Sequence, residues 1–331
     1  MPPGATLTPS LAMRPRYPNF ARRALPPQLW RWILVANLAA GVLFSGWYWF
    51  QPTGRQAEVD RLVSAALARD KRVGFLEVVW DIWELYYAGS GSGTVAPGDN
   101  RIVYGGLPRP KAEGEDLRVL VNQGYVVGYS DALGLARWAA YRVVDLPRIP
   151  PAPPRPDRFT VDRRTAARVE PQVYTGSGYD RGHLAPNFAI ATRHGAAAQR
   201  ETFLMSNIAP QRHRLNAGLW QDLEQRIATN YPARYGEVWV LTGPVLGPEP
   251  ARLKGRVAVP AAFYQIIVDE QDGRLRTLAF IVPQEAAAHA DLARYLTTIA
   301  EVEARTGLDF LAALEDAAER EVESRRAGRV W

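Results

Sequence analysis

The sequence of 331 residues contains no cysteine and only four histidines. The absence of cysteine excludes disulfide bonds, thiolate metal clusters and a cysteine nucleophile. Four histidines suffice for one catalytic imidazole but disfavour a histidine-rich metal cage. What is present, 47% hydrophobic and 22% charged residues, is typical of a globular chain. The length allows one large domain or two ordinary ones.

Acidic residues are absent from the first 50 positions, where five arginines occur. The whole chain has a formal net charge of +6, of which +5 lies in this tail and +1 in residues 51–331. The excess positive charge therefore belongs to the N-terminal tail, and it says little about what the main domain binds.

An uncharged stretch of 19 residues runs from Trp32 to Phe50. As a helix it would span roughly 28 Å, close to the thickness of a bilayer core. Tryptophans and Tyr48 gather at its two ends, as aromatic belts do. We therefore expect a basic tail over residues 1–29 and a transmembrane anchor over residues 30–50. A cleaved signal peptide and a buried soluble helix are the alternatives.

The arginines before this anchor outnumber those in the twenty residues after it. That bias favours a cytoplasmic N-terminus, with the bulk of the chain outside the cytoplasm of a bacterial inner membrane. A mitochondrial inner membrane is the alternative location, because an arginine-bearing, acid-poor tail also resembles a presequence.

Residues 51–94 are expected to form a helical stalk and linker. Within them, residues 73–88 place apolar side chains at a spacing of three to four, which predicts an amphipathic helix. This helix either packs on its own domain or rests on the membrane surface through Trp80, Trp83 and Tyr87.

The remaining chain, residues 95–325, is expected to be one α+β domain. The expected strands lie at Leu117–Val121, Tyr125–Tyr129, Ala139–Val144, Phe203–Met205, Val238–Leu241, Tyr264–Val268 and Leu275–Val282. Helices are expected at residues 215–229 and 285–305, and the proline-rich stretch 146–156 is expected to be an extended loop inside the domain.

One region carries residues suited to chemistry on a phosphodiester. Asp180–His183 combines an arginine, the natural fork for a phosphate, with a histidine that a neighbouring aspartate can orient. A return strand at Thr202–Met205 leads to a helix with Asn216, Trp220 and Glu224 at i, i+4 and i+8, roughly on one face. Two strands and a helix of this kind make a ββα unit that could hold one hard cation and one base.

These segments resemble the DNA/RNA non-specific endonucleases, the family of mitochondrial endonuclease G and of secreted sugar-non-specific nucleases. The resemblance covers about residues 100–312 and depends on ordered pieces: DRFTVD at 157–162, DRGH at 180–183, TF at 202–203, SN-x-x-PQ at 206–211, LN-x-x-x-W-x-x-LE at 215–224 and TGP at 242–244. It implies an α+β fold, a mixed sheet sandwich with a ββα-metal finger active site, here preceded by one N-terminal transmembrane helix.

The resemblance also implies roles for six residues. His183 would be the general base that takes a proton from the attacking water, and Asn216 would be the protein ligand of a single Mg²⁺, with Mn²⁺ able to substitute. Asn207 would position the histidine loop or the phosphate. Glu224 would orient water bound to the metal. Arg181 and Arg158 would face the phosphate. Read alone, Asn216 is also a good helix N-cap, and Arg181 a partner for Asp180.

The expected function is that of a membrane-anchored, Mg²⁺-dependent, sequence-non-specific endonuclease acting on phosphodiester bonds of DNA and RNA. One alternative is a catalytically silent, membrane-tethered protein that binds nucleic acid; another is a mitochondrial enzyme similar to endonuclease G. The expected partners are DNA and RNA as substrates and the membrane through residues 30–50. A second copy in a homodimer is left open.

Overall fold

The computed structural model describes residues 27–68, 73–87, 102–271 and 274–331. The chain divides into two compact units, residues 1–56 and residues 57–331. Most of the expected basic tail, the end of the expected linker and the domain boundary at residue 95 lie outside the described residues.

Helix α1 (Pro27–Trp49) contains a stretch, Trp30–Trp49, of 20 residues with a mean hydropathy of 1.3. It is long and apolar enough to cross a bilayer, and none of the window is buried. Asn37 donates Nδ2 to the Ile33 carbonyl at 2.6 Å, so its amide is satisfied inside the helix. Because a signal sequence near the N-terminus passes the same test of length and composition, the membrane anchor stays a prediction.

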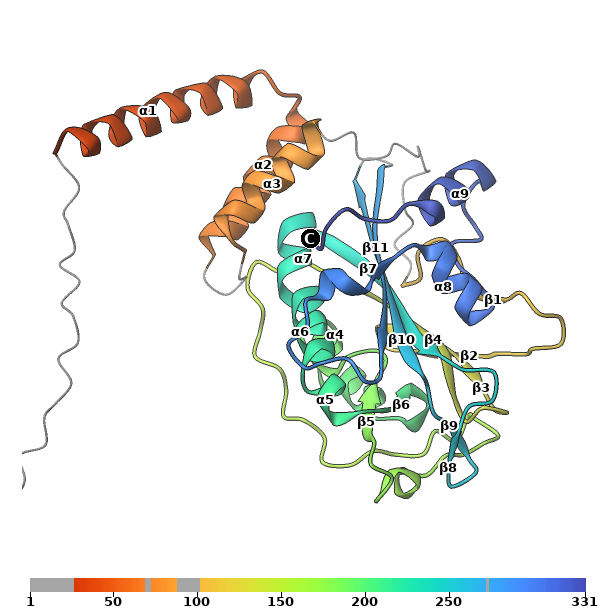
Figure 1. Ribbon diagram of the computed structural model, residues 1–331. Coiled ribbons are helices and arrows are strands. Elements are labelled where there is room, and N and C mark those ends of the chain that lie inside the picture. The colour runs from red at the N-terminus through yellow and green to blue at the C-terminus, as the bar shows by residue number, and fades with distance from the viewer. Residues whose placement is uncertain (1–26, 69–72, 88–101, 272–273) are drawn as a thin grey trace, which may run out of the picture. The chain divides into compact units, whose positions relative to one another are not determined.

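A seven-stranded sheet in the order β12-β11-β10-β7-β4-β3-β2 forms the centre of the second unit (Figure 1). All six pairings are antiparallel. The mixed sheet expected from the sequence is therefore corrected to an antiparallel one, because short hairpins join β2 to β3, β3 to β4 and β10 to β11. The strands are β2 (Arg118–Asn122), β3 (Tyr125–Ser130), β4 (Leu135–Val144), β7 (Glu237–Val245), β10 (Ala262–Gln271), β11 (Arg274–Pro283) and β12 (Leu296–Thr297).

Helices cover both faces of this sheet (Figure 1). Successive side chains of a strand point to opposite faces, so Val240 of β7 joins one core cluster and Leu241 the other. The first cluster includes side chains of α4 (Asn187–Thr202), α6 (Leu219–Gln225) and α7 (Tyr231–Tyr235); the second includes side chains of α8 (Ile299–Thr306) and α9 (Asp316–Ser324). The expected sandwich is thus a sheet between two helical layers.

Short elements complete the unit. They are the pairs β1 (Arg109–Pro110) with β13 (Leu308–Asp309), β5 (Asp180–His183) with β6 (Ile208–Gln211) and β8 (Arg252–Leu253) with β9 (Val257–Ala258), the single-turn helices η1 (Pro171–Tyr174), η2 (Met205–Asn207) and η4 (Leu292–Tyr295), and α5 (His213–Asn216) with the π-helix η3 (Arg226–Asn230).

Both helices expected in the main domain are corrected. The first half of 285–305 is not a continuous helix; α8 begins only where the Thr298 hydroxyl accepts the Glu301 N–H at 3.0 Å and caps it. The helix expected at 215–229 is interrupted at Gly218, whose backbone is not helical. A Cβ there would lie 2.6 Å from the Arg214 carbonyl oxygen, so only glycine fits. Helix α4 was not expected from the sequence, and Gly195 interrupts its helical backbone.

Helices α2 (Thr53–Leu67) and α3 (Phe75–Tyr87) confirm the helical predictions for this region. They do not form a free stalk, because residues from 57 onward belong to the same compact unit as the sheet. Leu62 of α2 and Val78 of α3 pack in one cluster with Ala233 of α7. The expected stalk is therefore part of the body of the unit.

Candidate active site

Strands β5 and β6 carry the site at one end of the chain's second unit. They pair antiparallel, with Asp180 opposite Gln211 and His183 opposite Ile208, and α5 follows β6 directly. Gly182 lets the strands meet, since a Cβ there would lie 2.7 Å from the Gln211 Cβ. The return strand is thus Ile208–Gln211. The stretch Thr202–Met205, expected as that strand, instead runs from the end of α4 to the start of η2, with an isolated parallel bridge between Leu204 and Thr160.

A cavity of about 260 Å³ opens beside these strands. It brings together four of the six predicted site residues, and its lining comprises Arg155, Arg181, His183, Pro186, Asn187, Phe188, Ala189, Asn216, Ala217, Gln221, Glu224 and Gln225. Arg158 does not line the cavity and is exposed, whereas Asn207 is fully buried behind it. Arg155, three residues before Arg158, lines the cavity instead.

His183 lies in an aromatic setting, with ring centroids 5.6 Å from Phe159 and 5.0 Å from Phe203. Its Nε2 is buried and has no hydrogen-bond partner among the described residues. Burial lowers the pKa of His183 to about 3, and the Arg155 guanidinium acts in the same direction. The imidazole is therefore neutral at pH 7, and neutral imidazole is the form that accepts a proton.

Asn216 is held by a carboxylate. Its Nδ2 donates to Asp180 Oδ2 at 2.9 Å, and His213 Nδ1 lies 2.8 Å from the same oxygen. Asp180 thus orients Asn216 and contacts His213, not His183 as the sequence suggested. Asn216 ends α5, and Gly218 is the N-cap of α6, so capping does not explain the asparagine. Because Nδ2 is occupied, Oδ1 is the atom left to take a cation.

Glu224 lines the same cavity from α6, one turn beyond the core residue Trp220. Burial raises the pKa of Glu224 to about 8, although Arg155 opposes the shift. A nearby cation would favour the carboxylate form.

The oxygen donors of this cavity fit a magnesium ion. The Asn216 amide oxygen and the Glu224 carboxylate are hard donors, which Mg²⁺ prefers. Within the part of the chain that the structure describes, no three His, Cys, Asp or Glu side chains come together to hold a metal ion. A metal here would therefore take most of its ligands from water and substrate, as Mg²⁺ commonly does.

Two guanidinium groups line the cavity. Arg181 donates Nη2 to the Pro171 carbonyl at 2.8 Å, so this contact, and not an ion pair with Asp180, holds it. Arg155 lies over the Phe203 ring at 5.1 Å. No pattern in the sequence points to Arg155, because its proline-rich loop has no periodicity and only the fold brings this side chain to the cavity.

Asn207 positions the segment that follows His183. Its Oδ1 accepts the Ala185 N–H at 2.9 Å, and its Nδ2 donates to the carbonyls of Ala185 and Thr202 at 2.9 and 3.0 Å. Its own carbonyl accepts the Leu184 N–H at 2.9 Å. Of the two roles expected for Asn207, this geometry supports the positioning of the histidine loop.

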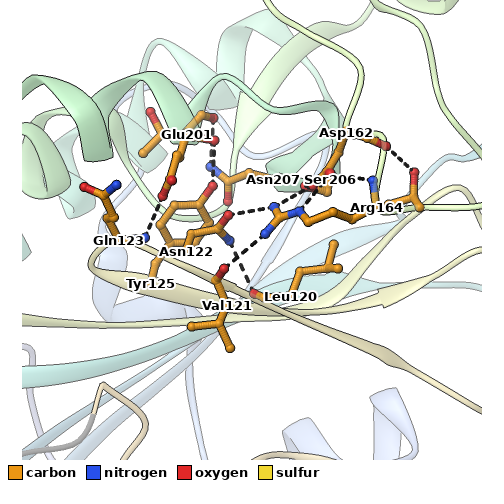
Figure 2. A network of polar contacts seen from close by, with 12 residues as sticks. Leu120, Val121, Asn122, Gln123, Tyr125, Asp162, Arg164, Glu201, Ser206 and Asn207 are labelled. Atoms are coloured by element: carbon orange, nitrogen blue, oxygen red, sulfur yellow. Dashed lines mark hydrogen bonds and ion pairs between the residues drawn. The ribbon is translucent and has the colours of Figure 1, made fainter.

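An ion pair between the buried Asp162 and the exposed Arg164 extends this network to the edge of the sheet (Figure 2). Ser206, next to Asn207, donates its hydroxyl to Asp162 at 2.7 Å, and Arg164 donates to the Val121 carbonyl on β2 at 3.0 Å. Burial alone would raise the pKa of Asp162, but the hydrogen bonds from Arg164 and Ser206 hold that pKa below its usual value. The sequence showed Asp162 only as the last residue of DRFTVD, without a partner.

Comparisons with known proteins find relatives of one family. A family model described as DNA/RNA non-specific endonuclease matches residues 106–317. A nuclease of a Nostoc species is 31% identical over 224 residues, covering 63% of this chain and 79% of that protein. Human mitochondrial endonuclease G is 33% identical over 151 residues, covering 42% of this chain and 50% of that protein.

A solved structure of an EndoG/EndoGI complex is similar with a TM-score of 0.52 and 25% identity. The similarity covers 60% of this chain and 86% of that one. Helices α1, α2 and α3 all precede the residues that the family model matches.

Proposed function

Because the chain belongs to the DNA/RNA non-specific endonuclease family, whose members hydrolyse phosphodiester bonds, we propose that it is a membrane-anchored, Mg²⁺-dependent enzyme that cleaves DNA and RNA without sequence preference. One observation carries the proposal: a neutral, unpartnered His183 Nε2 and the amide of Asn216 share a cavity with two arginines.

In this proposal β5, β6 and the helices α5 and α6 form the ββα-metal unit. Asn216 would hold the metal ion through Oδ1, oriented by Asp180, and the Glu224 carboxylate would face the same space. When bound, the ion supplies positive charge that stabilises the charge developing on the phosphate and on the leaving oxygen.

The chain's own residues supply the proton transfer and the binding of phosphate. His183 takes the proton of the attacking water at Nε2, which its burial keeps neutral. Asn207 holds the loop behind the imidazole, so the base keeps its direction. Arg155 and Arg181 bind the anionic phosphate. Contacts with phosphate carry no sequence information, which accounts for low sequence specificity.

Membrane anchoring rests on the exposed apolar helix α1 and on the arginines that precede it. With the N-terminus in the cytoplasm, the nuclease would lie outside it, away from the genome. A bacterial inner membrane is favoured. The identity with human mitochondrial endonuclease G keeps a mitochondrial inner membrane as the second candidate, which cell fractionation distinguishes. A homodimer stays a prediction, which mass measurement in detergent checks.

Plasmid nicking by the full chain in detergent tests the enzyme. Wild-type protein is compared with Asn216→Ala, each with Mg²⁺ and with EDTA. We expect cleavage by the wild type that EDTA abolishes, and a loss of cleavage in the variant that a higher Mg²⁺ concentration partly restores. A folded wild-type chain that binds DNA but never cuts it with any divalent metal would favour the catalytically silent tether.

A further inference from the structure

Helix α3 presents an exposed apolar face. Phe75 and Leu76 are 75% and 80% exposed, and Val79, Trp80 and Trp83 are each about half exposed. These positions follow the pattern i, i+1, i+4, i+5 and i+8, which places them on one side of a helix. Contiguous apolar patches of this kind usually mark a surface that binds a partner or a membrane.

The opposite side of α3 is fixed to the body of the unit. Asp81 accepts a hydrogen bond from Arg234 Nε at 2.6 Å, and both side chains are fully buried. Val78 packs beside them in the cluster around Ala233. Breaking a buried ion pair is costly, so the helix cannot roll to bury its apolar side. The exposed face is therefore a fixed feature of the folded unit.

The composition of this face fits the interfacial region of a bilayer. Tryptophan is enriched where the hydrocarbon core meets the headgroups, because its ring is large and carries a polar N–H. Helices that lie in this region carry Trp, Phe and Leu on one side. The Arg329 guanidinium lies 5.0 Å from the Trp80 ring and adds a cation at the edge of the face.

If α1 spans a bilayer, α3 follows it closely in the sequence and is tethered near that bilayer. Helix α1 ends at Trp49 and α3 begins at Phe75, with the 15 residues of α2 in the intervening segment. A surface contact made by a tethered helix is intramolecular, so even weak affinity keeps it occupied. A stable contact with a second copy buries about 800 Å² on each partner, more than one side of a single short helix offers.

We propose that the apolar face of α3 lies on the phospholipid surface of the membrane in which α1 is anchored, and holds the nuclease unit against it. The proposal rests on the membrane anchoring proposed above. It differs from that anchoring in assigning a second, peripheral contact to residues of the folded unit.

Because the chain has no cysteine, a single introduced cysteine can carry an environment-sensitive fluorophore. We would label Leu76→Cys in the full chain, reconstituted in phosphatidylcholine–phosphatidylglycerol vesicles, and quench the label with aqueous iodide or with doxyl-labelled phospholipid. Val121→Cys is the matched control, since Val121 is 67% exposed on the edge strand β2.

We expect the Leu76 label to be quenched by the doxyl lipid and shielded from iodide, and the Val121 label to show the reverse. Equal access of iodide to both labels would overturn the proposal. So would a Leu76 label shielded from both quenchers, which would indicate contact with protein. Flotation and nicking assays on the same vesicles separate the causes: a chain that does not float lacks the anchor, and one that does not cut lacks the proposed activity.

Discussion

The nuclease core and the helices before it expose opposite kinds of side chain to their surroundings. Around the active site, polar groups such as Asn207 and Asp162 are buried, and their side chains are held by hydrogen bonds. On α3, apolar groups such as Leu76 point outward while a charged pair is buried beneath them. Substitutions in the first region should therefore change catalysis, and those in the second should change where the enzyme sits and how firmly α3 is held.

The largest expected effect belongs to the base. Replacing His183 with alanine should lower kcat/KM by about 10³- to 10⁴-fold, because no other described side chain in the cavity is a neutral base. The unfolding midpoint should change little or rise. Plasmid nicking and thermal denaturation measure both quantities. The exposed His289 is the matched control: its replacement by alanine should leave the rate unchanged.

The next effect tests whether α3 belongs to the folded body. Asp81→Ala leaves the buried Arg234 guanidinium without its carboxylate and should cost about 3–5 kcal/mol in the free energy of unfolding. Glu321→Ala, which breaks an exposed pair with Arg325, should cost less than about 1 kcal/mol. Chemical denaturation of the full chain compares them. Equal losses would mean that α3 is only an appendage.

The two arginines of the proline-rich region give a paired test. Arg155→Ala should lower kcat/KM by about 10²-fold, since it removes a cation from the cavity wall. Arg158→Ala should leave kcat/KM nearly unchanged, because Arg158 is exposed outside the cavity. A larger loss from Arg158→Ala would restore the assignment made from the sequence and count against this cavity as the site of cleavage.

The smallest effect concerns pH and the network behind Asn207. The pKa of Asp162 is lowered in the folded state, so its carboxylate contributes stability above its unfolded pKa and loses it as the pH falls through the folded pKa. Asp162→Asn should therefore cost about 2 kcal/mol at pH 7, and the difference from wild type should shrink in acid. Thermal unfolding between pH 2.5 and 7 follows this. A constant difference would indicate that the charge of Asp162 does not matter.

Features that depend on residues close together in the sequence could be predicted, whereas contacts between distant residues could not. Apolar runs such as Tyr125–Tyr129 identify strands because strand pattern is local, and the motif around His183 identifies the family. The break at Gly218 escaped prediction because a helical period says nothing about a close contact with Ala288. The place of Arg155 in the cavity was not predicted, because the path of a loop depends on the whole fold. Asp81 and Arg234 are 153 positions apart, and no local pattern joins them.

The buried Nε2 of His183, which has no hydrogen-bond partner among the described residues, lowers the stability of the folded enzyme before substrate binds. The His183 side chain is buried beside Phe159 and Phe203, and no described protein group makes a hydrogen bond with Nε2 in exchange for its hydration. The buried imidazole is thus a local cost to the folding stability of the chain. An aromatic hydrocarbon in its place, as in His183→Phe, should raise the melting temperature while abolishing cleavage. The active site would then be a place where folding stability has been given up for reactivity.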